Sequence, residues 1–93
     1  MAGPTVKVTI AYCAECGYEP QTLELAGALM RAYALQLSSI ELIPWFDGSF
    51  EVSLDGELVH SMYREGGFPE SQAVIEAVRA RLASKAAVAA GSA

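Results

Sequence analysis

Two cysteines, Cys13 and Cys16, lie between an alternating segment and a long helical pattern, and this junction constrains the fold more than any other feature. Residues 6–12 (VKVTIAY) alternate apolar and polar side chains, which predicts a β-strand that ends at the first cysteine. Apolar residues then recur at intervals of three and four through residues 23–37, which predicts a helix. Pro20 suits the first turn of that helix because proline has no N–H to donate. We therefore expect both cysteines in the turn that precedes the helix.

A second strand, a hairpin and a second helix are predicted in the rest of the chain. Residues 39–43 form an apolar strand pattern, and residues 50–54 and 57–61 predict a hairpin because the Asp-Gly pair between them is a strong turn signal. With a two-residue turn, Glu51 would face His60 as a surface pair. The second helix is predicted to begin at Pro69.

The predicted element order is therefore β-α-β-β-β-α. A right-handed crossover makes the first two strands parallel, and the hairpin adds two antiparallel strands. This order predicts an α/β fold, a thioredoxin-like two-layer sandwich with a four-stranded mixed sheet and two helices on one face. We expect residues 1–85 to form a single domain and residues 86–93 to form a disordered C-terminal tail.

Composition excludes several classes of function. The net charge is −5, and the six lysines and arginines are scattered, so neither nucleic acid nor an anionic membrane is an expected partner. No apolar run approaches the roughly 18 residues of a membrane helix, and the first residues do not resemble a targeting segment. We therefore expect a cytoplasmic protein without a cofactor.

The C-x-x-C pair has three chemical interpretations. Cysteines at this spacing before a helix can cycle between dithiol and disulfide, which favours redox exchange. A zinc site usually needs four ligands, and this chain has one such pair and one histidine, so no metal is expected within a monomer. Two other interpretations stay open. Two copies of the chain could share one metal between their C-x-x-C pairs, or the pair could have only a structural role.

Topology predicts which other residues lie near the cysteines. If the third strand is antiparallel and lies beside the first, the ends of four segments converge on one edge of the sheet. Two large aromatic residues in the loop after Pro44 suggest a surface for docking a partner. Arg64, which follows the hairpin, would either stabilise a thiolate or be a solvated surface charge. Gly66 and Gly67 would either let a partner's backbone approach closely or form turns. The contact candidates are Trp45, Phe46, Phe50, Arg64, Gly66 and Gly67.

Several short motifs occur in order along residues 6–82. They are Tyr12-Cys13-x-x-Cys16-Gly17-Tyr18-x-Pro20, Leu23-x-Leu25, Phe50-Glu51-Val52, Gly56-x-Leu58-x-His60-Ser61 and Gly66-Gly67-Phe68. Together they resemble the selenoprotein W-like (Rdx) family. The resemblance implies a thioredoxin-like fold and a thiol-based redox role in the cytosol.

The resemblance also indicates which cysteine attacks a substrate and which one resolves the intermediate. Members that use selenocysteine carry it at the position of Cys16, which implies that Cys16 attacks and Cys13 resolves. In thioredoxin the first cysteine attacks, so the order stays open, with Cys16 slightly favoured. The chain lacks the proline that thioredoxins carry before the third strand, and residues 47–49 are expected to take its place.

Two functions follow from these features. The first is a thiol-disulfide oxidoreductase that uses Cys13 and Cys16 to reduce or exchange disulfides or glutathione adducts on partner proteins. The alternative is a redox-controlled interaction module with little turnover. Expected partners are protein thiols or disulfides and glutathione, and the protein is expected to be a monomer or a weak homodimer.

Overall fold

Alternating apolar residues form the central strand of the computed structural model, which describes residues 3–91. The strands are β1 (Val6–Cys13), β2 (Leu37–Trp45), β3 (Phe50–Leu54) and β4 (Glu57–Ser61). The helices are α1 (Glu19–Tyr33), the single turn α2 (Met62–Glu65) and α3 (Ser71–Gly91), with a short 3-10 turn η1 (Ala34–Gln36) between α1 and β2.

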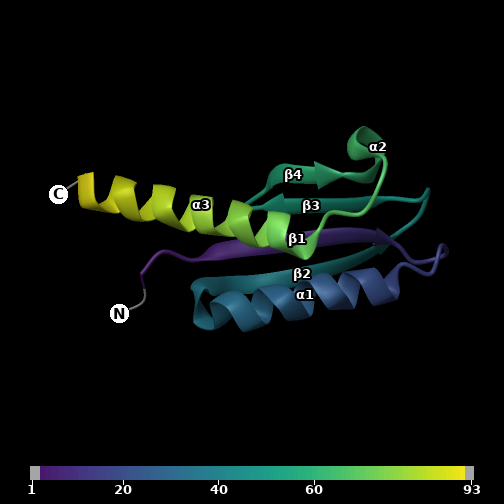
Figure 1. Ribbon diagram of the computed structural model, residues 1–93, viewed down its shortest axis with the longest axis horizontal. Helices are drawn as coiled ribbons and strands as arrows, with labels where there is room; N and C mark the ends of the chain where they lie inside the picture. The colour runs from purple at the N-terminus through teal and green to yellow at the C-terminus, as the bar shows by residue number, and fades with distance from the viewer. Residues whose placement is uncertain (1–2, 92–93) are drawn as a thin grey trace.

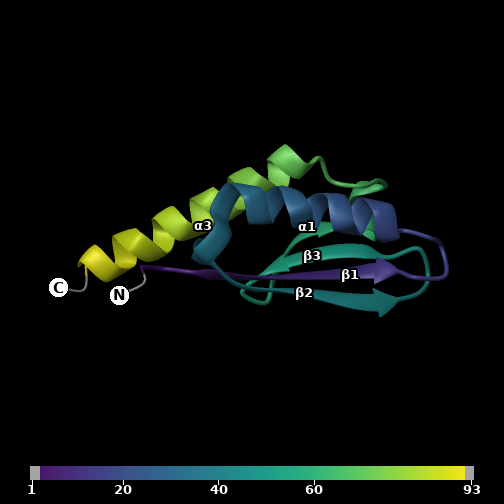
Figure 2. The same ribbon diagram turned by 90° about the horizontal axis from the view of Figure 1, so that it is seen from below.

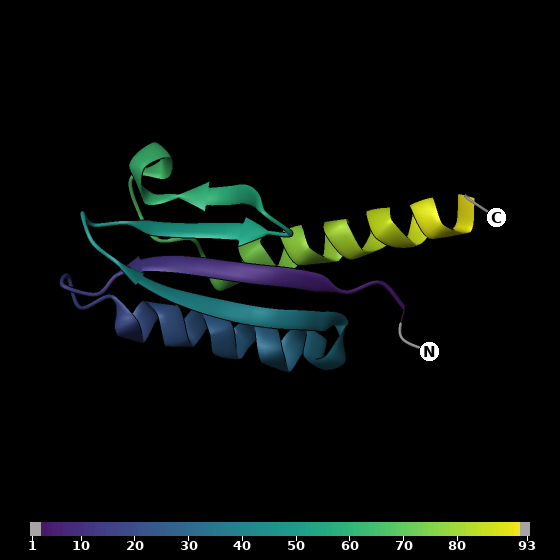
Figure 3. The ribbon, with the colours of Figure 1, turned by 180° about the vertical axis from the view of Figure 1, so that it is seen from behind.

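The four strands form one mixed sheet in the order β2-β1-β3-β4. β1 and β2 are parallel, and the other two pairs are antiparallel. The helices α1 and α3 lie on the same face of the sheet (Figure 2), and the opposite face carries no helix among the described residues (Figure 3). The predicted thioredoxin-like two-layer sandwich is confirmed, with the short α2 as an addition.

Several strands and helices begin or end at the same end of the sheet, where β1 finishes (Figure 1). β1, β2 and β4 end there, while β3 and α1 begin there, as the pairing directions require. We call this end of the sheet the cysteine end, because Cys13 is the last residue of β1. The convergence that the topology predicted is therefore present.

The core lies between the sheet and the two long helices. Alternate residues of β3 and of the first part of β1, residues 6–10, are buried, because alternate side chains of a strand point to the same face. Side chains of α1 and α3 cover them. The buried set is Val6, Val8, Ile10, Leu25, Leu29, Phe50, Val52, Leu54, Val74, Val78 and Leu82.

Helix α1 is rotated relative to the sequence expectation. Leu23 and Met30, which belonged to the predicted apolar stripe, are 62% and 55% exposed. Leu25 and Leu29 are buried instead. Because α1 carries leucine or methionine on more than one side, the spacing alone did not decide which side faces the sheet.

The C-terminal helix is longer than predicted. α3 continues to Gly91, so residues 86–91 are helical and the prediction of a disordered tail there is wrong. Residues 92–93 lie outside the described part of the chain. The segment 86–90 is Ala-Ala-Val-Ala-Ala, and alanine has the highest intrinsic helix propensity. Small side chains therefore favoured a helix, not a disordered tail.

The hairpin contains a bulge that its sequence pattern did not predict. Its turn is as predicted, with φ of 53° at Asp55 and 86° at Gly56. The register shifts between Val52 and Ser53, so His60 pairs with Val52, and the predicted pairing of His60 with Glu51 is wrong. As a result His60 is only 8% exposed and not a surface residue.

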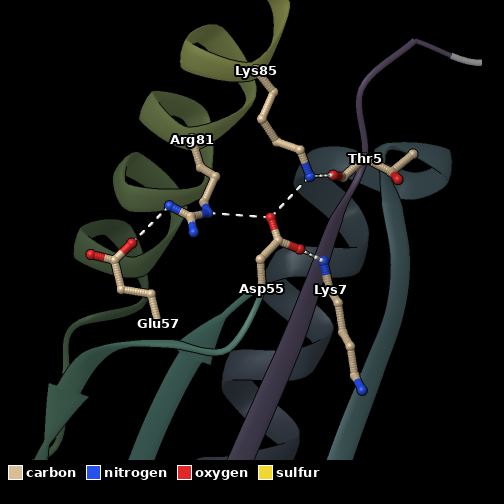
Figure 4. A network of polar contacts seen from close by, with 6 residues as sticks. All are labelled: Thr5, Lys7, Asp55, Glu57, Arg81 and Lys85. Carbon is tan, nitrogen blue, oxygen red and sulfur yellow. Dashed lines mark hydrogen bonds and ion pairs between the residues drawn. The ribbon is translucent and has the colours of Figure 1, made fainter. Parts of the chain in front are cut away.

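The hairpin turn is tied to the start of β1 and to α3 through one carboxylate (Figure 4). Asp55 accepts a hydrogen bond from the backbone N–H of Lys7 at 3.0 Å and contacts Lys85 Nζ at 2.9 Å and Arg81 Nε at 3.2 Å. These contacts, led by the Lys7 N–H, lower the pKa of Asp55 to about 2. Lys85 also donates to the carbonyl of Thr5, so the network holds the far end of the molecule together.

Replacing Asp55 with asparagine should make stability less sensitive to acid. Asparagine tolerates a positive φ and can still accept from the Lys7 N–H, but it carries no charge. Because the folded-state pKa is lowered from 3.8 to about 2, the carboxylate's contribution is present above about pH 4 and is lost as the pH falls toward 2. We expect Asp55→Asn to lose roughly 1 kcal/mol of unfolding free energy at neutral pH, allowing for solvent screening.

Urea unfolding of both proteins between neutral pH and about pH 2 measures this difference. The two stability curves should converge at the acidic end, because both side chains are then neutral. A gap that is the same at every pH would show that the charge of Asp55 does not stabilise the fold.

Candidate functional site

The turn after β1 brings the two cysteines together. Cys13 and Cys16 form a disulfide with a Cα–Cα distance of 5.3 Å. The Gly17 N–H donates to the Ala14 carbonyl at 3.1 Å, and the Tyr18 N–H donates to the Cys13 carbonyl at 3.3 Å. Gly17 has a φ of 76°, a left-handed conformation that glycine adopts without strain. The sequence therefore folds here into a tight turn that leads directly into α1.

The two sulfur-bearing residues differ in exposure. Cys13 is 0% exposed, whereas Cys16 is exposed. The connection from β2 to β3 passes the end of β1, and because Cys13 is buried and its backbone is bonded to this connection, we infer that the connection covers Cys13. The Cys13 N–H donates to the Ser49 carbonyl at 2.8 Å, and the Ala14 N–H donates to the Trp45 carbonyl at 3.0 Å. A partner that approaches the disulfide therefore reaches Cys16 first.

A tight turn at residues 46–49 forms this cover. Asp47 and Gly48 both have positive φ, of 65° and 69°, which characterises a type I′ turn. The hydroxyl of Ser49 donates to the Phe46 carbonyl at 2.9 Å, and the Tyr63 hydroxyl donates to the Asp47 carbonyl at 3.0 Å. Residues 47–49 therefore form a turn directly before β3, and whether they take the part of the thioredoxin proline stays a prediction.

The segment after α2 packs against the other side of the cysteine turn. Phe68 forms edge-to-face contacts with Tyr18, at a ring-centroid distance of 4.8 Å, and with Phe50, at 5.1 Å. His60 holds the segment in place, since its Nε2 lies 2.8 Å from the Gly67 carbonyl oxygen. We infer that Nε2 carries the proton, because a carbonyl can only accept.

Replacing His60 with alanine should destabilise the protein by about 1–3 kcal/mol, because the Gly67 carbonyl would lose its partner and the ring would leave a gap beside Phe50. His60→Gln should recover part of the loss, since its amide can donate to the same carbonyl. Urea unfolding with Leu58→Ala as the control tests this, because Leu58 lies on the same strand and is 43% exposed. Equal stability of His60→Ala and the unmodified protein would contradict it.

The structure separates the predicted contact residues into two groups. Trp45 and Phe46 are 51% and 46% exposed, and their rings stack at a centroid distance of 4.7 Å beside the disulfide. Phe50 is 1% exposed, so the prediction that it contacts a partner is wrong. Its position at the start of β3 points the ring into the core, which the alternation of that strand requires.

The remaining candidates, Arg64, Gly66 and Gly67, have local partners. Arg64 is exposed and pairs with Glu65 at 2.8 Å. Gly66 ends α2 in a left-handed conformation, with its N–H bonded to the Met62 carbonyl at 2.8 Å. Gly67 is held by His60. Turn chemistry accounts for both glycines, and a contact with a partner stays a prediction for all three.

Two hydroxyl groups that shape the site were not predicted from the sequence, although Ser49 belongs to residues 47–49, which were. Ser49 and Tyr63 both hold the turn that covers Cys13, and each does so through a hydrogen bond to a backbone carbonyl. A hydroxyl that bonds to a backbone carbonyl leaves no periodic signal. The Asp47-Gly48 pair was the available clue, because it favours a type I′ turn.

No group of three or more His, Cys, Asp and Glu side chains gathers as a metal site within residues 3–91. Over the same residues, no helix has the length and apolar character to cross a membrane. A metal shared between two copies of the chain stays a prediction.

Comparisons with known proteins converge on one family. The family model described as the Rdx family matches residues 7–80. Selenoprotein W of Mus musculus is 33% identical over 81 residues, which cover 82% of this chain and 92% of the relative. Migration and invasion enhancer 1 of Bos taurus is 39% identical over 77 residues, which cover 83% of this chain and 65% of the relative. The matched part thus spans about two thirds of the length of that bovine protein.

Solved structures show the same fold. A selenoprotein W-related protein from Vibrio cholerae superposes with a TM-score of 0.80 at 26% identity, covering 84% of this chain and 98% of that structure. A protein from Bordetella parapertussis superposes with a TM-score of 0.79 at 25% identity, covering 83% and 98%. The sheet order and helix placement described above are therefore shared with proteins of this type.

Proposed function

This chain belongs to the Rdx family, and we propose that it is a thiol-disulfide oxidoreductase in which Cys16 exchanges with partner proteins and Cys13 resolves the intermediate. The observation that carries the proposal is the unequal exposure of the two residues. Cys16 is exposed, while Cys13 is 0% exposed beneath the turn at residues 46–49. The proposal includes a cytoplasmic setting, where cellular thiols would keep the pair reduced.

The reaction can be written as two exchanges. The thiolate of Cys16 attacks one sulfur of a partner disulfide, a mixed disulfide forms, and the partner's other sulfur leaves as a thiolate that takes up a proton. The Cys13 thiolate then attacks the Cys16 sulfur, which releases the second partner sulfur and forms the Cys13–Cys16 bond. Two electrons pass to the partner, and two cellular thiols or one dithiol must supply two electrons, becoming a disulfide themselves, to restore the Cys13 and Cys16 thiols.

The local geometry favours this order of events. Cys13 is fixed by two backbone hydrogen bonds around it, from its own N–H to Ser49 and from Ala14 to Trp45. A sulfur in that position cannot meet a bulky partner, but it can reach Cys16 across one turn. A buried resolving thiol also has no competing access to solvent reagents, which favours the intramolecular second step.

Trapping the mixed disulfide tests the proposal. Reduced Cys13→Ser and Cys16→Ser variants would be mixed with a small disulfide-containing protein, and the products separated without reductant. We expect a stable covalent adduct with Cys13→Ser, because Cys16 attacks and nothing resolves the product. Cys16→Ser should give little adduct. If neither variant forms an adduct, disulfide exchange is not the function of the pair.

A second candidate function is a redox-controlled interaction module with little turnover. The stacked Trp45 and Phe46 favour it, because they are about half exposed and the Trp45 carbonyl is bonded to the backbone of the cysteine turn. Partner capture from a lysate with the oxidised and the reduced protein compares the two states. Different sets of captured partners would support the module, and identical sets would count against it.

A further inference from the structure

We propose that the cysteine end selects partner segments that carry lysine or arginine beside their exchanging cysteine, and that anionic thiols such as glutathione are poorer substrates. This proposal rests on the oxidoreductase function above and specifies its substrate class. It is drawn from the exposed Cys16, the stacked pair of Trp45 and Phe46, and the distribution of charge along the molecule.

The carboxylates near Cys16 lack compensating cations. Glu15 lies between the two cysteines, Glu19 opens α1, and Asp47 lies in the turn that covers Cys13, and all three are exposed. Within residues 3–91 none of the three takes part in an ion pair. Arg64, also at this end, is neutralised by Glu65 at 2.8 Å. The surroundings of Cys16 are therefore acidic.

The five other lysines and arginines lie away from this end or are paired, and two of them are Arg31, in the last turn of α1, and Arg79, which pairs with Glu76 on α3 at 2.7 Å. Lys85 and Arg81 are engaged with Asp55 at the opposite end of the sheet (Figure 4). Lys7 lies six residues before Cys13 along β1, a separation of about 20 Å in a strand. That exceeds twice the Debye length of about 8 Å at physiological ionic strength. These cations therefore do little to offset the acidic field at Cys16.

The aromatic pair indicates independently that a cation fits here. Trp45 pairs with Cys13 in the register of β1 and β2, so its ring lies on the strand next to the disulfide. One face of the indole stacks on Phe46, and because 51% of Trp45 is exposed, the proposal places a guanidinium or ammonium group on the remaining exposed surface of the ring. Such a contact contributes about 0.5–1 kcal/mol at an exposed site. An apolar surface with an acidic rim thus matches a basic polypeptide segment.

Glutathione differs from a basic polypeptide segment because its net charge is negative. It carries two carboxylates and one ammonium group at neutral pH, so its net charge has the same sign as the surroundings of Cys16. Like charges slow diffusional encounter and opposite charges accelerate it, and the difference falls as salt is added. The prediction is therefore one of rate, and it depends on ionic strength.

Single-turnover reduction of the oxidised protein by short cysteine peptides tests the proposal. Three peptides of equal length would flank the cysteine with arginines, with serines or with glutamates, and each rate would be divided by that peptide's rate with the uncharged hydroxyethyl disulfide. At low ionic strength we expect the arginine peptide to react about tenfold faster than the glutamate peptide. The ratio should fall toward one at high salt.

Two sets of variants identify the residues responsible. Glu15→Gln combined with Asp47→Asn should reduce the preference for the arginine peptide at least threefold, and asparagine keeps the positive φ that position 47 requires. Glu41→Gln combined with Glu76→Gln has the same net charge but changes residues on β2 and α3, so it should keep the preference. Trp45→Leu should slow the arginine peptide alone.

The outcomes separate the two proposals. If the uncharged reagent dithiothreitol reduces the disulfide but the three normalised peptide rates agree within threefold, the charge preference is wrong and the oxidoreductase proposal stands. If the glutamate peptide is faster, the preference is also wrong. If neither dithiothreitol nor any peptide reduces the pair, the oxidoreductase proposal itself fails.

Discussion

Replacing Phe50 with alanine should cost about 3–5 kcal/mol of unfolding free energy, the largest single loss of stability that we expect outside the backbone. Phe50 is among the largest fully buried side chains and is 1% exposed. Its ring contacts Phe68 at 5.1 Å and lies 6.5 Å from the ring of His60. Its removal would leave a cavity where the core meets the segment that supports the cysteine turn. Urea or thermal unfolding measures the loss.

Phe68→Ala provides the matched control for this substitution. The same side chain is removed from the same cluster, but Phe68 is 39% exposed, so less apolar surface loses its burial. We expect a loss of no more than about half that of Phe50→Ala. If the two variants were equally stable, the burial of Phe50 would contribute no more to stability than that of Phe68. Phe50→Leu should fall between the unmodified protein and Phe50→Ala, because leucine fills part of the space.

Replacing Cys16 with serine should reduce disulfide turnover to the uncatalysed rate. Without the Cys16 thiolate, the covered Cys13 is the remaining nucleophile, and a bulky partner cannot reach it. Cys13→Ser should instead carry out one exchange and stop at the mixed disulfide. Steady-state reduction of a protein disulfide, coupled to a thiol reductant, would show no turnover for either variant. A pre-steady-state measurement would show a burst of one equivalent for Cys13→Ser alone.

The two serine variants lose the same disulfide, which closes a loop of only four residues and restrains the unfolded chain by about 2 kcal/mol in the chain-entropy model. They differ in burial, because Cys13→Ser places a hydroxyl at a buried position and Cys16→Ser does not. Urea unfolding of both variants therefore gives the folded fraction to which each burst is normalised. Equal bursts from both variants would contradict the assigned roles.

The sequence predicted the arrangement of elements because the relevant signals are periodic. Alternation in residues 6–12 predicted β1, and the Asp-Gly pair predicted the turn at Asp55, since both depend on local backbone preferences. The convergence of strand ends then followed from the handedness of the crossover. The fold and the position of the cysteine turn were therefore predictable without a structure.

Features that depend on packing between elements were not predictable. The bulge that buries His60 shifts one strand by a single residue, and no local signal marks it. The second strand was predicted over residues 39–43, whereas β2 continues through Pro44 to Trp45, because it lies at an edge of the sheet and tolerates a proline. The burial of Cys13 depends on a turn more than thirty residues away in the sequence.

The most direct test of the central claim is the order in which the two reduced thiols react. A brief pulse of iodoacetamide on the fully reduced, folded protein, followed by peptide mapping, would report the modification of Cys13 and Cys16 separately. The exposure of Cys16 and the cover over Cys13 predict that Cys16 is modified first, by more than about tenfold. In denaturant the two thiols should react alike. Modification of Cys13 first, or of both at equal rates in the folded protein, would contradict the assignment of Cys16 as the exchanging residue.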